Sequence, residues 1–228
     1  MSHDCHRETH TDIVCTIAGE SVRLMPERTV YLERTNTLLA ADLHFGKAAA
    51  FRAWAIPVPP GTTGETLQTL TQALGRTGAQ RLILLGDILH AKESLAVETI
   101  AAVTSWRIEH AAIQIDVIRG NHDRHAGDPP LAWKMQVYPA PLLEPPFAYT
   151  HHPKTLPGHH VFAGHLHPAV ELRGVGRGKH RAACFWHQPG LTVLPAFGSF
   201  TGNSYIRPGR QDRVYVITEE SVVQVGTD

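Results

Sequence analysis

Asparagine, histidine and aspartate stand side by side in VIRGNHDR, residues 117–124, directly after a run of apolar residues. Four other apolar runs also end in acidic or imidazole side chains. Together the five runs present carboxylates, an amide and imidazoles, namely Asp42, His44, Asp87, Asn121, His151, His165 and His167. Such oxygen and nitrogen donors suit Mn²⁺, Zn²⁺ or iron, whereas a structural zinc site commonly uses cysteine. Seven donors exceed what one tetrahedral ion binds, so they predict two divalent ions sharing a bridging carboxylate, with a phosphate ester as substrate.

The elements that must position these side chains are short strands bounded by glycine or proline. The runs are TLLAADLH, RLILLGD, IQIDVIRGNHD, FAYTHHP and HVFAGHLH. Helical leucine spacing predicts a helix over residues 62–79, and Leu95, Ile100 and Val103 predict another over 94–110. The C-terminal part holds LTVLPAF, DRVYVITEE and SVVQV, which predict consecutive strands. An α/β front half and a β-rich back half follow, with the site beyond the carboxyl ends of the strands.

Composition limits the class of protein. The 228 residues carry 21 Lys and Arg against 21 Asp and Glu, which argues against a broadly basic nucleic-acid binder but allows a local basic groove. Three widely spaced cysteines, no apolar leader and no membrane-length apolar run predict a soluble, cytoplasmic protein. We expect one domain over residues 13–228 after a flexible tail, residues 1–12, whose His and Cys residues could alternatively bind metal.

The ordered motifs DLH, GD, GNHD, a following His and GHLH resemble those of the calcineurin-like metallophosphoesterases. The resemblance implies an α/β (α+β) fold, a four-layer αββα sandwich of two mixed sheets flanked by helices. It assigns Asp42, His44 and His167 to one metal, Asn121, His151 and His165 to the other, and Asp87 to both. It also implies that a metal-bridging hydroxide attacks phosphorus, that His122 contacts the phosphate, and that Asp123 orients the His122 imidazole.

A narrower resemblance runs from about Ala40 to Gly202. The segments LLAADLHFGKAAAFR, IPVPPGTT, LLGDILHA, RGNHDR, AGHLHPAV, CFW and LPAFGSFTG are similar to the bacterial ligase-associated DNA damage response endonucleases. This family implies a manganese-dependent phosphodiesterase that cuts DNA, in single-stranded or flexible regions, and that functions with a DNA helicase and an ATP-dependent DNA ligase. One departure is Asn203, where the family has a second glycine.

Several residues allow two interpretations. Neighbours on a strand face opposite sides, so we expect His151 to bind metal and His152 to lie at the rim. His90 lines the pocket or begins a helix in solvent. Lys47, Arg52 and Arg124 contact phosphate or are solvated charges, and we favour phosphate for Lys47 and Arg124. The remaining group could stack bases, but most of its members are expected in the core: Phe45, Phe51, Trp54, Phe185 and Trp186.

Two other functions compete with DNA cleavage. The same metal ligands would serve a phosphodiesterase or phosphomonoesterase for small nucleotides or phosphoproteins, which the neutral net charge favours. A degenerate scaffold that only binds a partner should have lost ligands or the phosphate-contacting histidine. Both are kept here, which argues against a scaffold.

Overall fold

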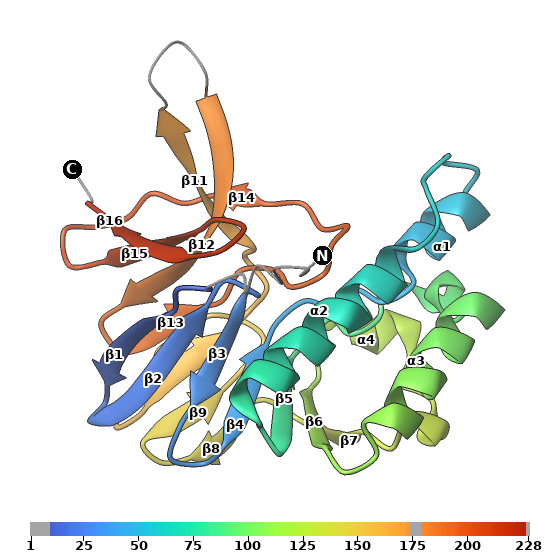
Figure 1. The fold of residues 1–228 in the computed structure, drawn as a ribbon, viewed down its shortest axis with the longest axis horizontal. Coiled ribbons are helices and arrows are strands. Elements are labelled where there is room, and N and C mark those ends of the chain that lie inside the picture. Colours follow the sequence, from blue (N-terminus) through green and yellow to red (C-terminus); the bar gives the residue numbers. More distant parts are fainter. Residues whose placement is uncertain (1–9, 174–178, 227–228) are drawn as a thin grey trace, which may run out of the picture.

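The computed structural model describes residues 10–173 and 179–226. Two β-sheets pack face to face, and the helices cover the outer face of the first sheet (Figure 1). The predicted sandwich of two mixed sheets flanked by helices is confirmed.

The first sheet holds seven strands in chain order. The first three pairings are antiparallel and the last three are parallel. The strands are β1 (Ile13–Ile17), β2 (Glu20–Met25), β3 (Thr29–Leu32), β4 (Thr37–Ala40), β5 (Arg81–Leu85), β6 (Gln114–Ile118) and β7 (Gln136–Tyr138). Central parallel strands are buried on both faces, which explains the unbroken apolar runs of β4 and β5.

Four α-helices lie between β4 and β7 in the chain: α1 (Lys47–Ala53), α2 (Thr62–Thr77), α3 (Val97–Glu109) and α4 (Asn121–Ala126). Two short 3₁₀ turns accompany them, η1 (Lys92–Ser94) and η2 (Leu131–Trp133). Helix α2 buries Leu67, Leu70 and Leu74, as their spacing predicts. Helix α3 buries Val103 but leaves Ile100 exposed, because Trp106 rather than Ile100 fills its inner face.

The second sheet holds the β-rich back half predicted from the sequence. Its main path runs β14-β11-β12-β13-β10-β9-β8, and β15 and β16 continue from β12. The strands are β8 (Leu142–Glu144), β9 (Phe147–Tyr149), β10 (His160–Ala163), β11 (Pro168–Arg173), β12 (Lys179–Gln188), β13 (Leu191–Val193), β14 (Ser204–Tyr205), β15 (Arg213–Ile217) and β16 (Val222–Val225). Within the described residues no α-helix follows α4.

One apolar core joins the two sheets. Leu39 and Leu85 of the first sheet share it with Phe147, Phe162 and Phe185 of the second. Burying this surface from water holds the sheets together and aligns the carboxyl ends of β4, β5 and β6 with those of β9 and β10.

The predicted tail, residues 1–12, falls mostly outside the described residues. Thr11 pairs with β16 through Val222, and Asp12 lies 2.8 Å from Arg76. None of the helices in the described ranges is both long and apolar enough to cross a membrane.

Candidate metal centre

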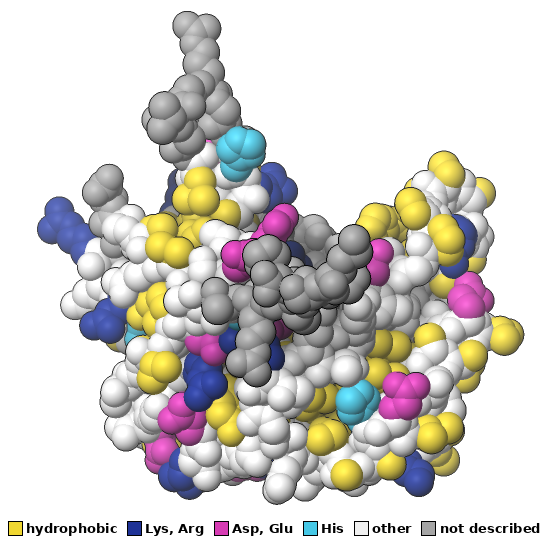
Figure 2. Space-filling model, in the orientation of Figure 1, with side chains coloured by type: hydrophobic (Ala, Val, Ile, Leu, Met, Phe, Trp, Pro, Cys, Tyr) yellow, Lys and Arg dark blue, Asp and Glu magenta, His cyan; other side chains and the backbone are white. Residues whose placement is uncertain are grey.

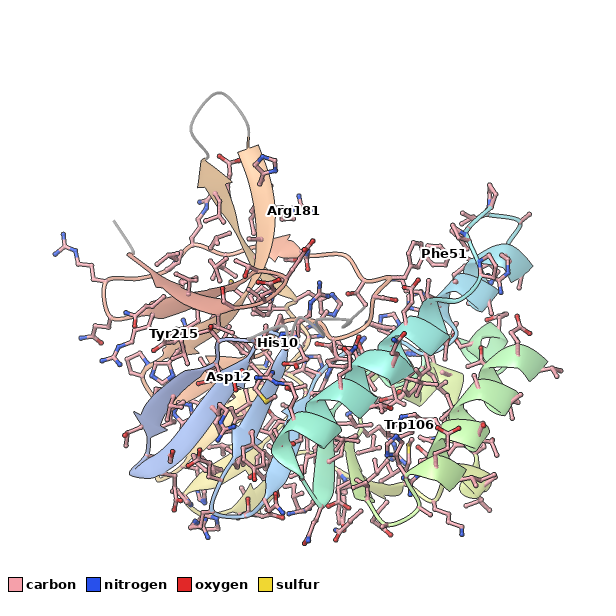
Figure 3. The ribbon with its side chains drawn as sticks, viewed as in Figure 1. His10, Asp12, Phe51, Trp106, Arg181 and Tyr215 are labelled. Carbon is pink, nitrogen blue, oxygen red and sulfur yellow. The ribbon has the colours of Figure 1, made fainter. Side chains whose placement is uncertain are left out.

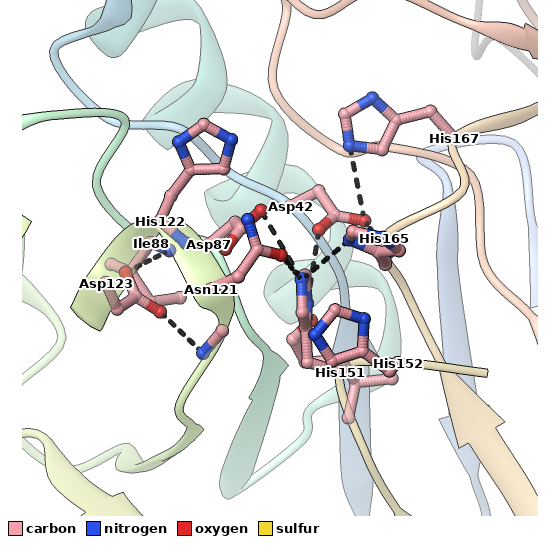
Figure 4. Close-up of polar contacts among 12 residues, drawn as sticks. Asp42, Asp87, Ile88, Asn121, His122, Asp123, His151, His152, His165 and His167 are labelled. Carbon is pink, nitrogen blue, oxygen red and sulfur yellow. Dashed lines mark hydrogen bonds and ion pairs between the residues drawn. The ribbon is translucent and has the colours of Figure 1, made fainter. Parts of the chain in front are cut away.

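Five strand ends deliver the predicted donors to one place (Figure 4). Asp42 follows β4, Asp87 follows β5, Asn121 begins α4 after β6, His151 follows β9, and His165 follows β10. Strands β4, β5 and β6 are parallel to one another, and so are β9 and β10. The carboxyl ends of each set therefore lie at the same edge of their sheet. The structure therefore brings together residues separated by more than a hundred positions.

Asp42, His44 and His167 form the first group. Their potential ligand atoms lie within 4.8 Å of one another, and His167 Nε2 is 3.6 Å from Asp42 Oδ2. Asp42 Oδ1 and His44 Nδ1 are buried, and the described residues give neither atom a hydrogen-bond partner. A buried polar atom without a partner is costly, so both atoms fit a site that binds a cation.

His151 organises the second group. Its Nδ1 donates to the Leu85 carbonyl at 3.1 Å, which leaves a lone pair on Nε2. That nitrogen lies 2.8 Å from Asn121 Oδ1, 3.1 Å from His165 Nδ1 and 3.4 Å from Asp87 Oδ2. Atoms that carry lone pairs and face one another repel unless a proton or a cation lies among them, so this group also fits a metal.

Asp87 lies between the groups. With Asp42 and His151 it forms a third set of donors within 4.8 Å of one another. Its Oδ1 accepts the backbone N–H of His122 at 2.9 Å, and its Oδ2 faces His151. A carboxylate so placed can reach ions on both sides.

Burial sets the protonation of these side chains. Desolvation, reinforced by the neighbouring cationic groups, lowers the pKa of His44 to about 2. Desolvation also lowers the pKa of His151 to about 4, although Asp42 opposes the shift. Burial raises the pKa of Asp87. At neutral pH the imidazoles of His44 and His151 are therefore neutral, which is the form that binds metal.

The backbone is strained at the same residues. Asp42, His44, Asp87, His165 and His167 all have positive φ, from 46° to 73°. This left-handed region is unfavourable for residues with a Cβ and persists where the surrounding structure enforces it. Five such residues in one cluster indicate that the fold holds them for their side chains.

His122 stands beside the donors with its orientation fixed. Its Nδ1 lies 2.9 Å from the His90 carbonyl oxygen, which can only accept, so the proton sits on Nδ1 and Nε2 is left for a ligand. The carboxylate of Asp123 lies beneath this segment: its Oδ1 accepts the N–H groups of Ile88 and Leu89, and its Oδ2 accepts that of Gly120. In this structure the contact that orients the His122 ring comes from the His90 carbonyl, and Asp123 supports the segment that carries it.

The expected substrate-contacting residues lie on two sides of the centre. The His90 ring is partly buried and stacks on that of His122, with centroids 4.9 Å apart. Lys47 begins α1 on the same side, and its Nζ lies over the Phe51 ring. On the other side a cavity of about 270 Å³ is bordered by Arg119, Arg124, Lys154 and the two histidines of the HHP motif. Arg119 is paired with Asp128, while neither Arg124 nor Lys154 forms an ion pair within the described ranges.

His152 lies closer to the donors than expected. It is exposed, yet its ring centroid is 4.3 Å from that of His165, and the two share a donor set with His151. Strand alternation fails here because β9 ends at Tyr149. Pro153, which follows His152, was the available signal that the strand had ended. Nothing in the sequence indicates the roles of two backbone carbonyls. The His90 carbonyl accepts from His122 Nδ1, and the Gly202 carbonyl lies 2.9 Å from His167 Nδ1.

Comparison with known proteins identifies similar structures. A nuclease from Pseudomonas putida, MPE, superposes with a TM-score of 0.81 at 38% sequence identity, covering 90% of this chain and 96% of its own. YfcE, a phosphoesterase from E. coli, is 18% identical with a TM-score of 0.43, covering 84% of this chain and 99% of its own. No protein-family model and no curated protein matches the chain.

Proposed function

Since this chain belongs to the ligase-associated metallophosphoesterases, the family of the Pseudomonas putida nuclease, we propose that it is a binuclear phosphodiesterase that cuts DNA. The observation that carries the proposal is the convergence of Asp42, Asp87, Asn121, His151 and His165 beside the fixed ring of His122. Neutral imidazoles and carboxylates in that arrangement fit two divalent ions, and Mn²⁺ is the first choice, with Zn²⁺ or iron suiting the same donors.

Two bound ions would supply an activated water and the positive charge that holds the phosphate oxygens. The protein residues do the rest. Asp42, His44 and His167 would hold one ion, Asn121, His151 and His165 would hold the other, and Asp87 would serve both. When His122 is protonated, its Nε2–H donates a hydrogen bond to a phosphate oxygen and passes its proton to the leaving oxygen. Asp123 acts through the backbone of residues 88–90 and is a positioning residue.

A nucleic-acid substrate is supported by charge next to the centre. The overall charge is zero, but Arg124 and Lys154 border the cavity beside His151 without forming an ion pair in the described ranges. Lys47 lies on the opposite side. Cations on both sides of a phosphate-binding centre suit a chain of phosphates more than a single small ester. We also propose a cytoplasmic DNA-repair role together with a helicase and an ATP-dependent ligase.

The test compares metals and substrates. Wild type and His122→Ala are loaded with Mn²⁺, Zn²⁺ or iron and given single-stranded DNA, supercoiled plasmid and a chromogenic phosphodiester. We expect metal-dependent cleavage of DNA that falls steeply with salt, because phosphate contacts release counterions. His122→Ala should keep its metal and lose roughly 10²–10⁴-fold in DNA cleavage, the usual range for a general acid.

Two results would change the proposal. Cleavage of small esters alone, without a steep salt dependence, would favour the alternative, a phosphoesterase for small nucleotides or phosphoproteins. DNA cleavage by His122→Ala at the wild-type rate would remove His122 from the mechanism. His180→Ala is the matched control, because His180 is exposed on β12, away from the donor sets.

A further inference from the structure

We propose that Phe51 and Trp54 form a stacking subsite for an unpaired nucleobase next to the scissile phosphate. The inference rests on the proposed function and deepens it, because it names the feature of the substrate that one wall of the site recognises. Phe51 lies near the end of α1 and Trp54 directly follows the helix.

A continuous series of rings leads from the reacting centre to the surface. The His122 ring stacks on that of His90, with centroids 4.9 Å apart and planes 23° apart. The His90 ring contacts that of Phe51 at 5.6 Å and that of Trp54 at 6.1 Å. Phe51 in turn contacts Trp54 at 5.8 Å and Phe200 at 5.7 Å. Figure 3 shows Phe51 directed from α1 toward the segment between β13 and β14. The nucleotide next to a phosphate bound at His122 would therefore lie beside these rings.

Trp54, at the outer end of this series, is exposed to solvent, whereas Trp106 and Trp133 are buried. Trp54 is 46% exposed, whereas Trp106 is 5% and Trp133 is 0% exposed. Phe45 and Phe185, also candidates for stacking, are buried in the core and are not available to a ligand. Large aromatic faces left open beside a site favour binding of another flat apolar group.

The wall is held in place by its backbone. Gly46, which precedes α1, has φ 70°, and a Cβ there would collide with the backbone of Ser94. Helix α1 thus packs directly on η1, and its Ala48, Ala49 and Ala50 are buried. Arg52 pairs with Glu98 at 3.0 Å and ties the same helix to α3. A fixed platform loses little entropy when a base stacks on it.

The charge beside the rings suits a nucleotide rather than an apolar molecule. Lys47 Nζ lies 5.7 Å from the centre of the Phe51 ring. Arg52 is occupied by Glu98, so Lys47 is the cation that faces this wall. One aromatic face and one cation match a base and its phosphate. A base paired in a duplex already stacks on its neighbours, so the subsite selects single-stranded or opened DNA.

The experiment compares two strands of equal charge. Wild type, Trp54→Ala, Phe51→Ala, Trp54→Phe and Leu131→Ala are assayed on oligo(dT) and on an equally long oligomer of abasic tetrahydrofuran nucleotides. Leu131 is a matched control because it is 96% exposed and lies outside the ring group. A second readout is quenching of tryptophan fluorescence by each oligomer.

For wild type we expect kcat/KM to be at least about fivefold higher on oligo(dT) than on the abasic strand, the lower end of what a stacking aromatic contributes. Trp54→Ala and Phe51→Ala should bring the ratio toward one. Trp54→Phe and Leu131→Ala should keep it, and Trp54→Phe should lose most of the quenching. Equal cleavage of both strands by wild type, or a wild-type ratio in both alanine variants, overturns the subsite alone. Cleavage of neither strand with any metal overturns the proposed function and the subsite with it.

Discussion

The imidazole of His122 is held by the backbone of His90, whose carbonyl oxygen lies 2.9 Å from His122 Nδ1. The carboxylate of Asp123 holds that same segment through the N–H groups of Ile88 and Leu89, at 2.9 and 3.1 Å. The aspartate of the NHD motif thus fixes its neighbouring histidine indirectly, through a loop from another strand. Hydrogen bonds between the side chains of one motif and the backbone of the other thus join two motifs that are 35 residues apart in the sequence.

Replacing Asp123 with Asn should loosen this lock. The carboxylate accepts three backbone N–H groups, whereas an amide has one acceptor oxygen and turns its own N–H₂ toward a donor. Leaving a buried donor unsatisfied costs about 1–3 kcal/mol. We expect that loss in the free energy of unfolding, measured in urea, and a lower kcat on DNA.

The matched control is Asp128→Asn, since Asp128 is an exposed residue paired with Arg119. It should change the free energy of unfolding by less than about 1 kcal/mol. A fully stable and active Asp123→Asn protein would mean that the three hydrogen bonds do not position His122.

Asp87→Asn tests whether one carboxylate serves both groups of donors. The amide keeps the shape and can still accept from the backbone of His122, but it loses the negative charge that faces His151. Metal content measured by elemental analysis after dialysis should fall from about two ions per chain, the number proposed for a shared site. A chelator should lower the melting temperature of wild type, because bound ligand stabilises the folded state, and should lower that of Asp87→Asn much less.

Glu98→Gln is the control, because Glu98 is exposed and pairs with Arg52 instead of facing the donors. If Asp87→Asn bound as much metal as wild type, Asp87 would not be a ligand of either ion.

Gly120→Ala asks whether the space before Asn121 is needed. The φ of Gly120 is −88°, which alanine adopts freely, so backbone strain does not enter. A Cβ there would collide with Asp87, both its Oδ1 and its backbone nitrogen. We expect weaker metal binding and a large loss of DNA cleavage, both measured from the rate of DNA cleavage as the metal concentration is increased. Gly64→Ala in α2 is the matched control, because a Cβ there meets no atom within 4 Å. Gly127→Ala is unsuitable as a control, because the φ of Gly127 is 95° and alanine would be strained there.

The sequence allowed most of the centre to be located, because a strand end is a local pattern. The runs before Asp42, Asp87, Asn121, His151 and His165 are each apolar and end abruptly, and the structure ends β4, β5, β6, β9 and β10 within two or three residues of these donors. What could not be predicted depends on backbone atoms of distant segments. The rings of His122 and His167 are oriented by hydrogen bonds to the backbone carbonyls of His90 and Gly202. Every residue has a backbone carbonyl, so the residue types do not indicate these contacts.

The aromatic residues show a second limit. Phe45 and Phe51 have similar surroundings in the sequence, yet Phe45 is buried and Phe51 lies beside His90. Burial of an aromatic depends on which other element packs against it, and sequence spacing does not record that.

The stability of the second sheet should depend on pH through His160. This residue is 7% exposed, its Nε2 lies 2.8 Å from Thr192 Oγ1, and it stacks on His187, which shares the same hydroxyl. Burial, with a contribution from His187, lowers its pKa to about 4. In the unfolded chain a histidine has a pKa near 6.5, so between those values the unfolded state takes up a proton that the folded state does not. The stability from His160 is therefore complete above pH 6.5 and is lost as the pH falls toward 4, by on the order of 3 kcal/mol.

His160→Gln should flatten the decline in the free energy of unfolding between pH 7 and pH 4.5, relative to wild type and to the exposed control His180→Gln. An equally steep decline in His160→Gln would place the acid sensitivity elsewhere, in the buried imidazoles of the metal centre.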